Sequence, residues 1–102
     1  MSTSVALELL ADVHRRAVVG YCRDEADTRI SLERLVSGVI CDLTEDFGEE
    51  LNPVDVRTRL HHVHLPKLAE AGVVDYDPET NVVQYRGDPL VEELFVTVED
   101  EA

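Results

Sequence analysis

The sequence predicts an α+β fold, and this prediction rests on two adjacent stretches. Residues 52–71 combine an N-cap with apolar side chains at helical spacing and predict one long helix. A glycine at position 72 ends that helix, and β-prone runs at residues 73–76 and 82–85 enclose a turn-rich loop. A long helix, a glycine stop and a two-stranded hairpin form the second half of a winged helix-turn-helix.

The length of 102 residues argues for a single domain that spans residues 1–102. We expect a three-helix core with a two-stranded wing at about residues 5–87, followed by an extra C-terminal helix at about residues 88–98. No apolar run is long enough to cross a bilayer, and no basic leader precedes an apolar block at the N-terminus. These features predict a cytoplasmic protein.

The first half of the chain is predicted to supply two helices and a short strand. Residues 4–23 keep an approximate helical period, in one or two pieces, and residues 28–30 are expected to be extended. Ser31 is an N-cap for a second helix at residues 32–42, and the acidic residues 43–51 are expected to form a loop with at most one helical turn. The apolar stripe of the second helix consists of Leu32, Leu35, Val36, Val39 and Ile40.

The long helix has a strong start and an interrupted interior. Asn52 is a favourable N-cap, and Pro53 suits the first helical position. Pro66 removes a backbone donor and conflicts with the carbonyl group of His62, so we expect a kink there and a shifted apolar phase beyond it. The side chains expected to face the core before the proline are Val56, Leu60 and Val63.

The C-terminal helix is predicted to begin at Asp88 and Pro89 by the same pattern of cap and proline. Together with the opening helix, it is the expected surface of a homodimer, through Leu90, Leu94 and Phe95. Packing of the same side chains within one chain is the alternative.

The chain is strongly acidic. Its 22 acidic and 9 basic residues give a formal net charge of −13 at pH 7, and Lys67 is its only lysine. Such a composition suits a halophilic protein that is adapted to very high salt, because the Debye length falls to about 3 Å in molar salt and self-repulsion nearly vanishes. An acidic protein from ordinary salt is the alternative. A halophilic origin would weaken the usual argument that an acidic protein avoids nucleic acid.

The polar face of the long helix carries residue types that fit a DNA duplex. Arginine can contact guanine or phosphate, and threonine and histidine can donate to bases or phosphates. A solvated polar face is the alternative, and the acidic wing loop at residues 75–79 argues against simple phosphate binding. The predicted DNA-binding residues are Arg57, Thr58, Arg59, His61 and His62 on the helix and Arg86 at the end of the hairpin.

Neither an enzyme nor a cofactor is expected. The sequence contains no Gly-rich phosphate loop, no GxSxG elbow and no HExxH motif. His61 and His64 could share a metal ion if His14 or Cys22 supplied a further ligand, but we expect packed or solvent-facing histidines and no metal. Cys22 and Cys41 lack CxxC spacing and are expected to be buried free thiols.

The string RLHHVHLPKLAEAGVVDYD, from Arg59 to Asp77, resembles a family of small haloarchaeal domains with winged-helix character and unknown function. The N-terminal LELLADVHRRAVVGYC is similar to the opening helix of that family, so the resemblance covers roughly residues 5–87. The positions that match the family's motif are His64, Pro66, Lys67, Leu68, Ala71, Gly72, Val73, Val74, Asp75 and Tyr76.

More distantly, HLPKLAEAGVV resembles the recognition helix of ArsR-type winged-helix repressors. That resemblance implies a dimeric transcription regulator, with Arg57, Thr58, Arg59, His61 and His62 at the DNA. The chain departs from the repressor pattern at its proline within the helix, in its acidic wing and in lacking the cysteine motif of the metal-sensing members.

We therefore predict a sequence-specific double-stranded DNA-binding transcription regulator that acts as a homodimer. One alternative is a protein–protein interaction module that keeps the winged-helix fold without DNA binding. Another is a regulator that responds to a metal or a small molecule.

Overall fold

The computed structural model describes residues 1–25, 27–48 and 50–101 and confirms the α+β class. The helices are α1 (Thr3–Ala11), α2 (Val13–Asp24), α3 (Leu32–Phe47), α4 (Pro53–Arg59), the π-turn η1 (Leu60–His64), α5 (Leu65–Glu70) and α6 (Pro89–Glu101). The strands are β1 (Arg29–Ser31), β2 (Val74–Asp77) and β3 (Val82–Tyr85). None of the helices in this described part has the length and apolar character needed to cross a membrane.

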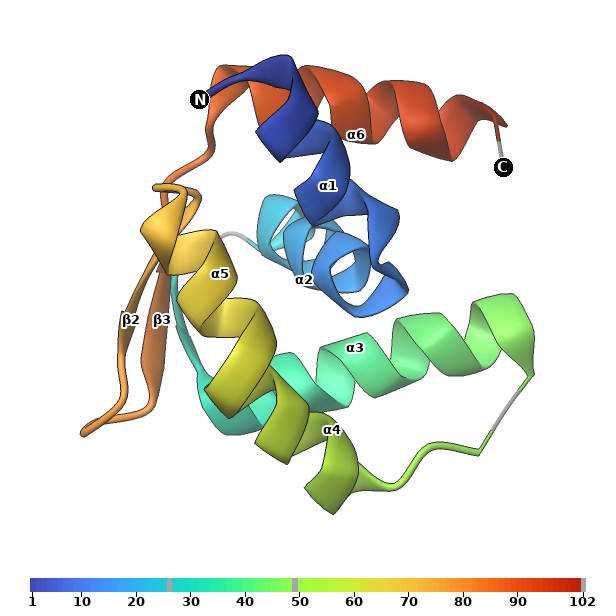
Figure 1. Cartoon of the computed structure of the whole chain (residues 1–102). Coiled ribbons are helices and arrows are strands. Elements are labelled where there is room, and N and C mark those ends of the chain that lie inside the picture. The colour runs from blue at the N-terminus through green and yellow to red at the C-terminus, as the bar shows by residue number, and fades with distance from the viewer. Residues whose placement is uncertain (26, 49, 102) are drawn as a thin grey trace.

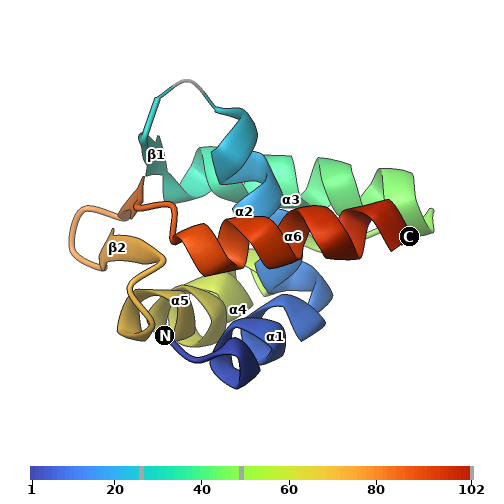
Figure 2. The same ribbon diagram turned by 90° about the horizontal axis from the view of Figure 1, so that it is seen from above.

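The strands form one antiparallel sheet in the order β1-β3-β2. β2 and β3 make the predicted hairpin, and β1 pairs with the other edge of β3, where Ile30 lies opposite Val83. Figure 1 shows the sheet at one side of the helical body, with α6 running across α1 and α2. Figure 2 shows the same arrangement from above. The sheet therefore joins the start of α3 to the hairpin that follows the long helix.

Side-chain hydrogen bonds fix the starts of the helices. Oγ of Ser31 accepts the backbone N–H of Arg34 at 3.2 Å, and Oδ1 of Asn52 accepts that of Val54 at 2.9 Å. Asp88 caps the start of α6 in the same way. Each such cap contributes about 1 kcal/mol to helix stability. The three N-caps predicted from the sequence are thus confirmed.

The core receives side chains from all three strands and from every helix, including α4, η1, α5 and α6. Burial of a valine or leucine side chain contributes about 1.5–3 kcal/mol, so this set fixes how the elements pack. The largest fully buried side chains are Leu10, Ile30, Leu32, Leu35, Leu60, Leu65, Leu68, Val18, Val19, Val39, Val73 and Val74.

The helix predicted at residues 32–42 is α3, and it is longer than predicted. The prediction of a loop at residues 43–47 is therefore wrong. α3 continues to Phe47 and ends at Gly48, which takes a left-handed φ of 66° as its C-cap. Leu43 is buried and prolongs the apolar stripe by another turn. Packing of this stripe therefore outweighs the acidic composition that suggested a loop. Of the remaining loop, residue 49 lies outside the described residues.

The predicted long helix is continuous over Pro53–Glu70, which we call the central helical segment, but it contains a π-turn. In η1 the backbone N–H of Leu65 donates to the carbonyl oxygen of Leu60, one residue farther back than in an α-helix. The extra residue in this turn changes which side chains face the core. His64 is 4% exposed whereas Val63 is 43% exposed, so the prediction that Val63 faces the core is wrong.

The π-turn also explains how the segment accommodates its proline. Pro66 lies in the first turn of α5, directly after the wide turn, where a missing N–H is best tolerated. At the place where a kink was predicted, the helix thus has one added residue in the turn that precedes Pro66. The apolar phase shifts as expected, from Val56 and Leu60 to Leu65 and Leu68.

The side chains expected at a dimer surface pack within the chain. Phe95 is 8% exposed and lies against Gly20 of α2, and the guanidinium of Arg23 lies 4.8 Å from the centre of its ring. Leu90 and Leu94 are half-buried and pack against the core. These contacts agree with the intramolecular alternative, and the homodimer itself stays a prediction.

Gly38→Ala is expected to destabilise the protein, because a Cβ at this position of α3 would overlap the ring of Tyr21 on α2. Alanine gains up to about 1 kcal/mol of helix propensity over glycine, whereas overpacking costs about 1–3 kcal/mol. The free energy of unfolding, measured with urea in molar KCl, should therefore fall by about 1 kcal/mol or more. Ser37→Ala, at the exposed neighbouring position, is the control and should cost nothing. Equal stability of the two variants would mean that α2 and α3 are less closely packed.

Candidate nucleic-acid interface

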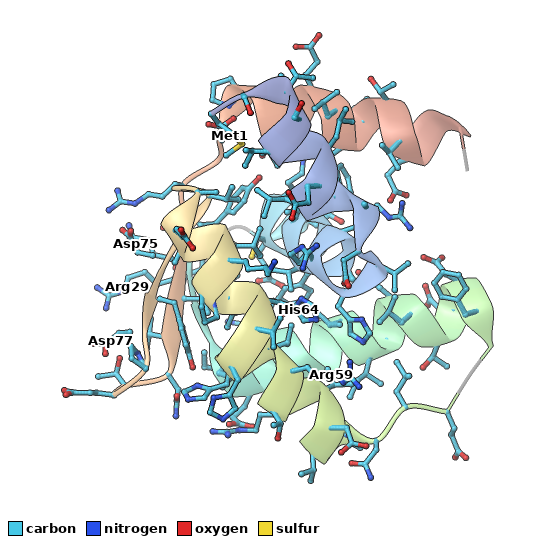
Figure 3. All side chains as sticks on the ribbon, viewed as in Figure 1. Met1, Arg29, Arg59, His64, Asp75 and Asp77 are labelled. Carbon is cyan, nitrogen blue, oxygen red and sulfur yellow. The ribbon has the colours of Figure 1, made fainter. Side chains whose placement is uncertain are left out.

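The central helical segment presents part of the predicted DNA-binding set to solvent. Thr58 and Arg59 on α4 and His62 on η1 are exposed, as the sequence predicts. Figure 3 shows Arg59 and His64 on this segment. Within residues 1–25, 27–48 and 50–101, the guanidinium of Arg59 forms neither an ion pair nor a hydrogen bond. Its guanidinium is therefore available to a partner molecule.

Two of the predicted arginines are already paired with carboxylates. Nε of Arg57 donates to Oε1 of Glu33 on α3 at 2.9 Å. Nε of Arg86 donates to Oδ2 of Asp75 on β2 at 2.6 Å. Both pairs lie at the surface, so each arginine has a carboxylate that a DNA phosphate would have to replace.

His61 joins the central helical segment to the hairpin. Its Nδ1 lies 2.5 Å from the hydroxyl oxygen of Tyr76, and this hydroxyl donates to Oδ1 of Asn81 at 3.2 Å. Asn81 holds the hairpin turn with a positive φ of 57°. Since the hydroxyl proton goes to Asn81, Nδ1 of His61 is the donor in the other bond. His61 thus positions the hairpin beside the segment, and its predicted contact with DNA stays a prediction.

The hairpin is acidic at its surface but has a cation beside it. Asp75, Asp77 and Glu79 are all exposed. Arg29 on β1 lines a shallow pocket together with the first two of these acids, as Figure 3 shows for the labelled side chains along the sheet. The sequence reasoning missed Arg29, because no local pattern indicates that β1 pairs with β3.

A second polar group lies where α1, α2 and η1 meet. Oδ1 of Asp12 is 3.7 Å from Nδ1 of His14 and 3.9 Å from Nε2 of His64. The two imidazole rings are stacked, with centroids 5.3 Å apart and planes 6° from parallel. His64 therefore meets His14, and not His61 as their spacing of three residues allowed.

Arg15 holds this junction from within. It is 8% exposed, and its Nε donates to the carbonyl oxygen of Leu9 at 2.9 Å while Nη2 donates to that of Glu8 at 3.1 Å. Its Nη1 lies 3.3 Å from Nδ1 of His64. Carbonyl groups in the last turn of a helix have no partner within the helix, so Arg15 caps α1 from α2. One side chain thus connects α1, α2 and the central helical segment.

The protonation states of the junction follow from these contacts. Burial lowers the pKa of His64, Asp12 opposes that effect, and the charges of Arg15 and Arg59 reinforce it. Partial burial raises the pKa of Asp12, but hydrogen bonds from the backbone of His14 and Arg15 and the nearby positive charges lower it overall. Because an arginine side chain can only donate, Nδ1 of His64 accepts and the neutral ring carries its proton on Nε2, facing Asp12.

The prediction of two buried thiols is half right. Cys22 on α2 is 3% exposed, and burial raises the pKa of its thiol to about 12. Cys41 is exposed, because it falls outside the apolar stripe of α3. Both cysteines are free thiols.

The chain matches a protein family. Residues 7–84, from α1 through most of β3, match the domain of unknown function DUF7344. The chain belongs to this family. No curated protein and no solved structure matches the chain. The expected haloarchaeal origin and the likeness to ArsR-type repressors stay predictions.

The DUF7344 match encloses both groups of residues described above. It contains the central helical segment and most of the hairpin, and it contains the junction of Asp12, His14 and His64. It ends before Arg86 and α6. The shared domain therefore includes the exposed helical face, whereas the C-terminal helix lies outside the matched span.

Arg15→Met is expected to destabilise the domain, because it keeps the length of the side chain but leaves the buried carbonyl group of Leu9 and the part-buried carbonyl group of Glu8 without their donor. The free energy of unfolding should fall by about 2–4 kcal/mol. Urea unfolding followed by circular dichroism measures the loss. Arg16→Met is the matched control, since the side chain of Arg16 forms no hydrogen bond within the described residues. If both variants lose the same amount, Arg15 does not hold the junction.

Proposed function

We propose that this DUF7344 domain is a winged-helix protein that binds double-stranded DNA sequence-specifically and regulates transcription as a homodimer. The observation that carries the proposal is the exposure of Thr58, Arg59 and His62 on a helical segment that leads into an antiparallel hairpin.

The order of the elements supports a winged-helix fold. α2, β1 and α3 precede the central helical segment, and β2 and β3 follow it as a hairpin. In a helix-turn-helix, the second helix of the pair enters the major groove and the first crosses the backbone. α3 packs directly against α4, so α3 would brace the DNA backbone while the central helical segment reads the groove.

The outer face of the central helical segment has the chemistry of a base-reading surface. Arg59 can donate two parallel hydrogen bonds to guanine, and Thr58 and His62 can donate to bases or phosphates. Val54 is 70% exposed and Val63 is 43% exposed on the same segment. Methyl groups of this kind can contact the methyl group of thymine. Exposed methyl groups are unfavourable in water, so a face that combines them with hydrogen-bond donors is better suited to contact with base edges.

The acidic surroundings set the conditions under which binding should occur. Arg57 and Glu33 retain side-chain exposures of 41% and 68%, and an exposed ion pair contributes only about 0–1 kcal/mol. A phosphate can therefore replace the carboxylate at little cost. The net charge of −13 repels a duplex in dilute salt, but molar salt screens this repulsion. Direct contacts must then supply most of the affinity, since counterion release contributes less at high salt.

Arg59→Ala and His62→Ala should each weaken DNA binding. The probe is a fluorescent duplex selected by the wild-type protein from a pool with a randomised centre, and binding is followed by anisotropy in molar KCl. Loss of one base contact costs about 1–3 kcal/mol, or roughly 5–150-fold in affinity. Arg16→Ala, which makes the same charge change on α2, should leave affinity unchanged. If no duplex is selected, or if Arg59→Ala binds like the wild type, the proposed function is wrong.

Glu33→Gln should strengthen binding to the same duplex, because it frees Arg57 to contact phosphate. Glu45→Gln is the control, since Glu45 makes the same charge change at an exposed position of α3. The gain for Glu33→Gln should exceed that of the control and should vanish in the double variant Glu33→Gln with Arg57→Ala. Equal gains for Glu33→Gln and Glu45→Gln would remove Arg57 from the interface.

A protein–protein interaction module is the second candidate. The exposed acids of the hairpin, Asp75, Asp77 and Glu79, favour it because they would suit a basic partner surface. The same selection experiment separates the two candidates, since a protein-binding module enriches no duplex.

A further inference from the structure

The junction of Asp12, His14 and His64 has no part in the proposed DNA contact. One ligand atom from each of these side chains lies within 4.8 Å of the other two. Within the described residues, no other group of three or more histidines, cysteines and acidic residues comes this close together. We propose that the Asp12–His14–His64 cluster is a binding site for a divalent transition-metal ion of the zinc class.

The distances are close to those that such an ion needs. Zinc binds nitrogen at about 2.0–2.1 Å in a tetrahedron, which puts neighbouring ligand atoms about 3.3 Å apart. The observed distances from Oδ1 of Asp12 are 3.7 Å to His14 and 3.9 Å to His64. Binding therefore requires each of these two edges to close by less than about 1 Å. The edge between the two histidine nitrogens is at most 4.8 Å long and must also close, and one of the stacked rings must turn so that both nitrogen lone pairs face the ion.

The burial of the cluster is graded from the core to solvent. The side chain of His64 is 6% exposed, that of His14 is 23% exposed and that of Asp12 is 34% exposed. His64 anchors the site in the packed interior, while Asp12 and His14 leave a path for the ion to enter. A water molecule can complete the tetrahedron on that open side, as in zinc sites with three protein ligands.

The donor set selects the kind of metal. Two imidazole nitrogens and one carboxylate suit zinc, cobalt, nickel and copper, whereas magnesium and calcium prefer oxygen ligands alone.

Arg15 is an internal competitor for His64. It donates to Nδ1, so the proton of the neutral ring is on Nε2, the atom that faces Asp12. An ion at Nε2 would move that proton to Nδ1, and Nη1 of Arg15 would then lose its acceptor while its bonds to Leu9 and Glu8 remain. Metal binding therefore exchanges one cationic partner of His64 for another. Arg59 lies close enough to act on the same ring, so the affinity should be moderate.

A tag-free protein titrated with Co²⁺ in the absence of DNA tests the site. We expect one equivalent per chain to develop the visible absorption of tetrahedral Co²⁺, and Zn²⁺ to displace it. His14→Gln and Asp12→Asn should each weaken Co²⁺ binding by roughly tenfold or more, and asparagine still caps α2. His62→Gln, which changes an exposed histidine on the same segment, is the control and should bind like the wild type.

His64→Gln risks unfolding the core, so the two variants at the partly exposed ligands carry the test. The proposal is wrong if no stoichiometric absorption develops, if binding survives both His14→Gln and Asp12→Asn, or if His62→Gln loses as much as they do. The side-chain NMR signal of Arg15 gives a second readout, which should shift on Zn²⁺ addition and stay in place in His14→Gln. The titration contains no DNA, so its failure leaves the proposed DNA binding untouched.

Discussion

The backbone hydrogen bond from Leu65 to Leu60 determines which side of the central helical segment faces the core. It spans one residue more than an α-helical bond, and the residue it adds turns His64 inward and leaves Val63 at the surface. The same wide turn lets a helix continue into Pro66. π-turns of this kind are frequent at functional sites, because they change the direction of side chains without ending the helix. Here the π-turn places Val63 on the exposed face of the segment and the next residue, His64, in the core.

Polar contacts attach the inner and lateral sides of this segment to three neighbours. Arg57 reaches α3, His61 reaches the hairpin through Tyr76, and His64 reaches the junction of α1 and α2 through Arg15. A rigid scaffold behind an exposed face is what sequence-specific contacts require, since a misplaced donor loses its base. Because the net charge is −13, repulsion within the chain depends strongly on salt concentration. High salt relieves repulsion within the chain, and under the proposed function it would also let a duplex approach.

Local signals made much of this architecture predictable, and non-local contacts explain what was not. The caps at Ser31, Asn52 and Asp88 and the glycine before the hairpin act within a few residues, so the sequence indicates them directly. The length of α3 was underestimated, because burial of Leu43 against other elements outweighs its acidic neighbours. The exposure of Val63 was missed because periodicity assumes a constant turn. That assumption fails in η1.

The exposed residues of the candidate site could be predicted from the sequence, but the side chains with which its other residues pair could not. Thr58, Arg59 and His62 follow from helical geometry alone. The pairing of Arg57 with Glu33 joins residues 24 positions apart, and the contact of Arg15 with His64 joins residues 49 positions apart. Contacts between residues this far apart in the sequence depend on how the elements pack, and local residue spacing cannot predict them.

The most direct test of the central claim is an NMR titration of the ¹⁵N-labelled protein with its selected duplex in molar KCl. The claim is that the outer face of the central helical segment is the DNA-binding surface. We predict that backbone signals of Thr58, Arg59 and His62 shift most, while those of α6 stay in place. Shifts confined to the acidic hairpin or to α6, or no shift at any ratio of duplex to protein, would contradict it.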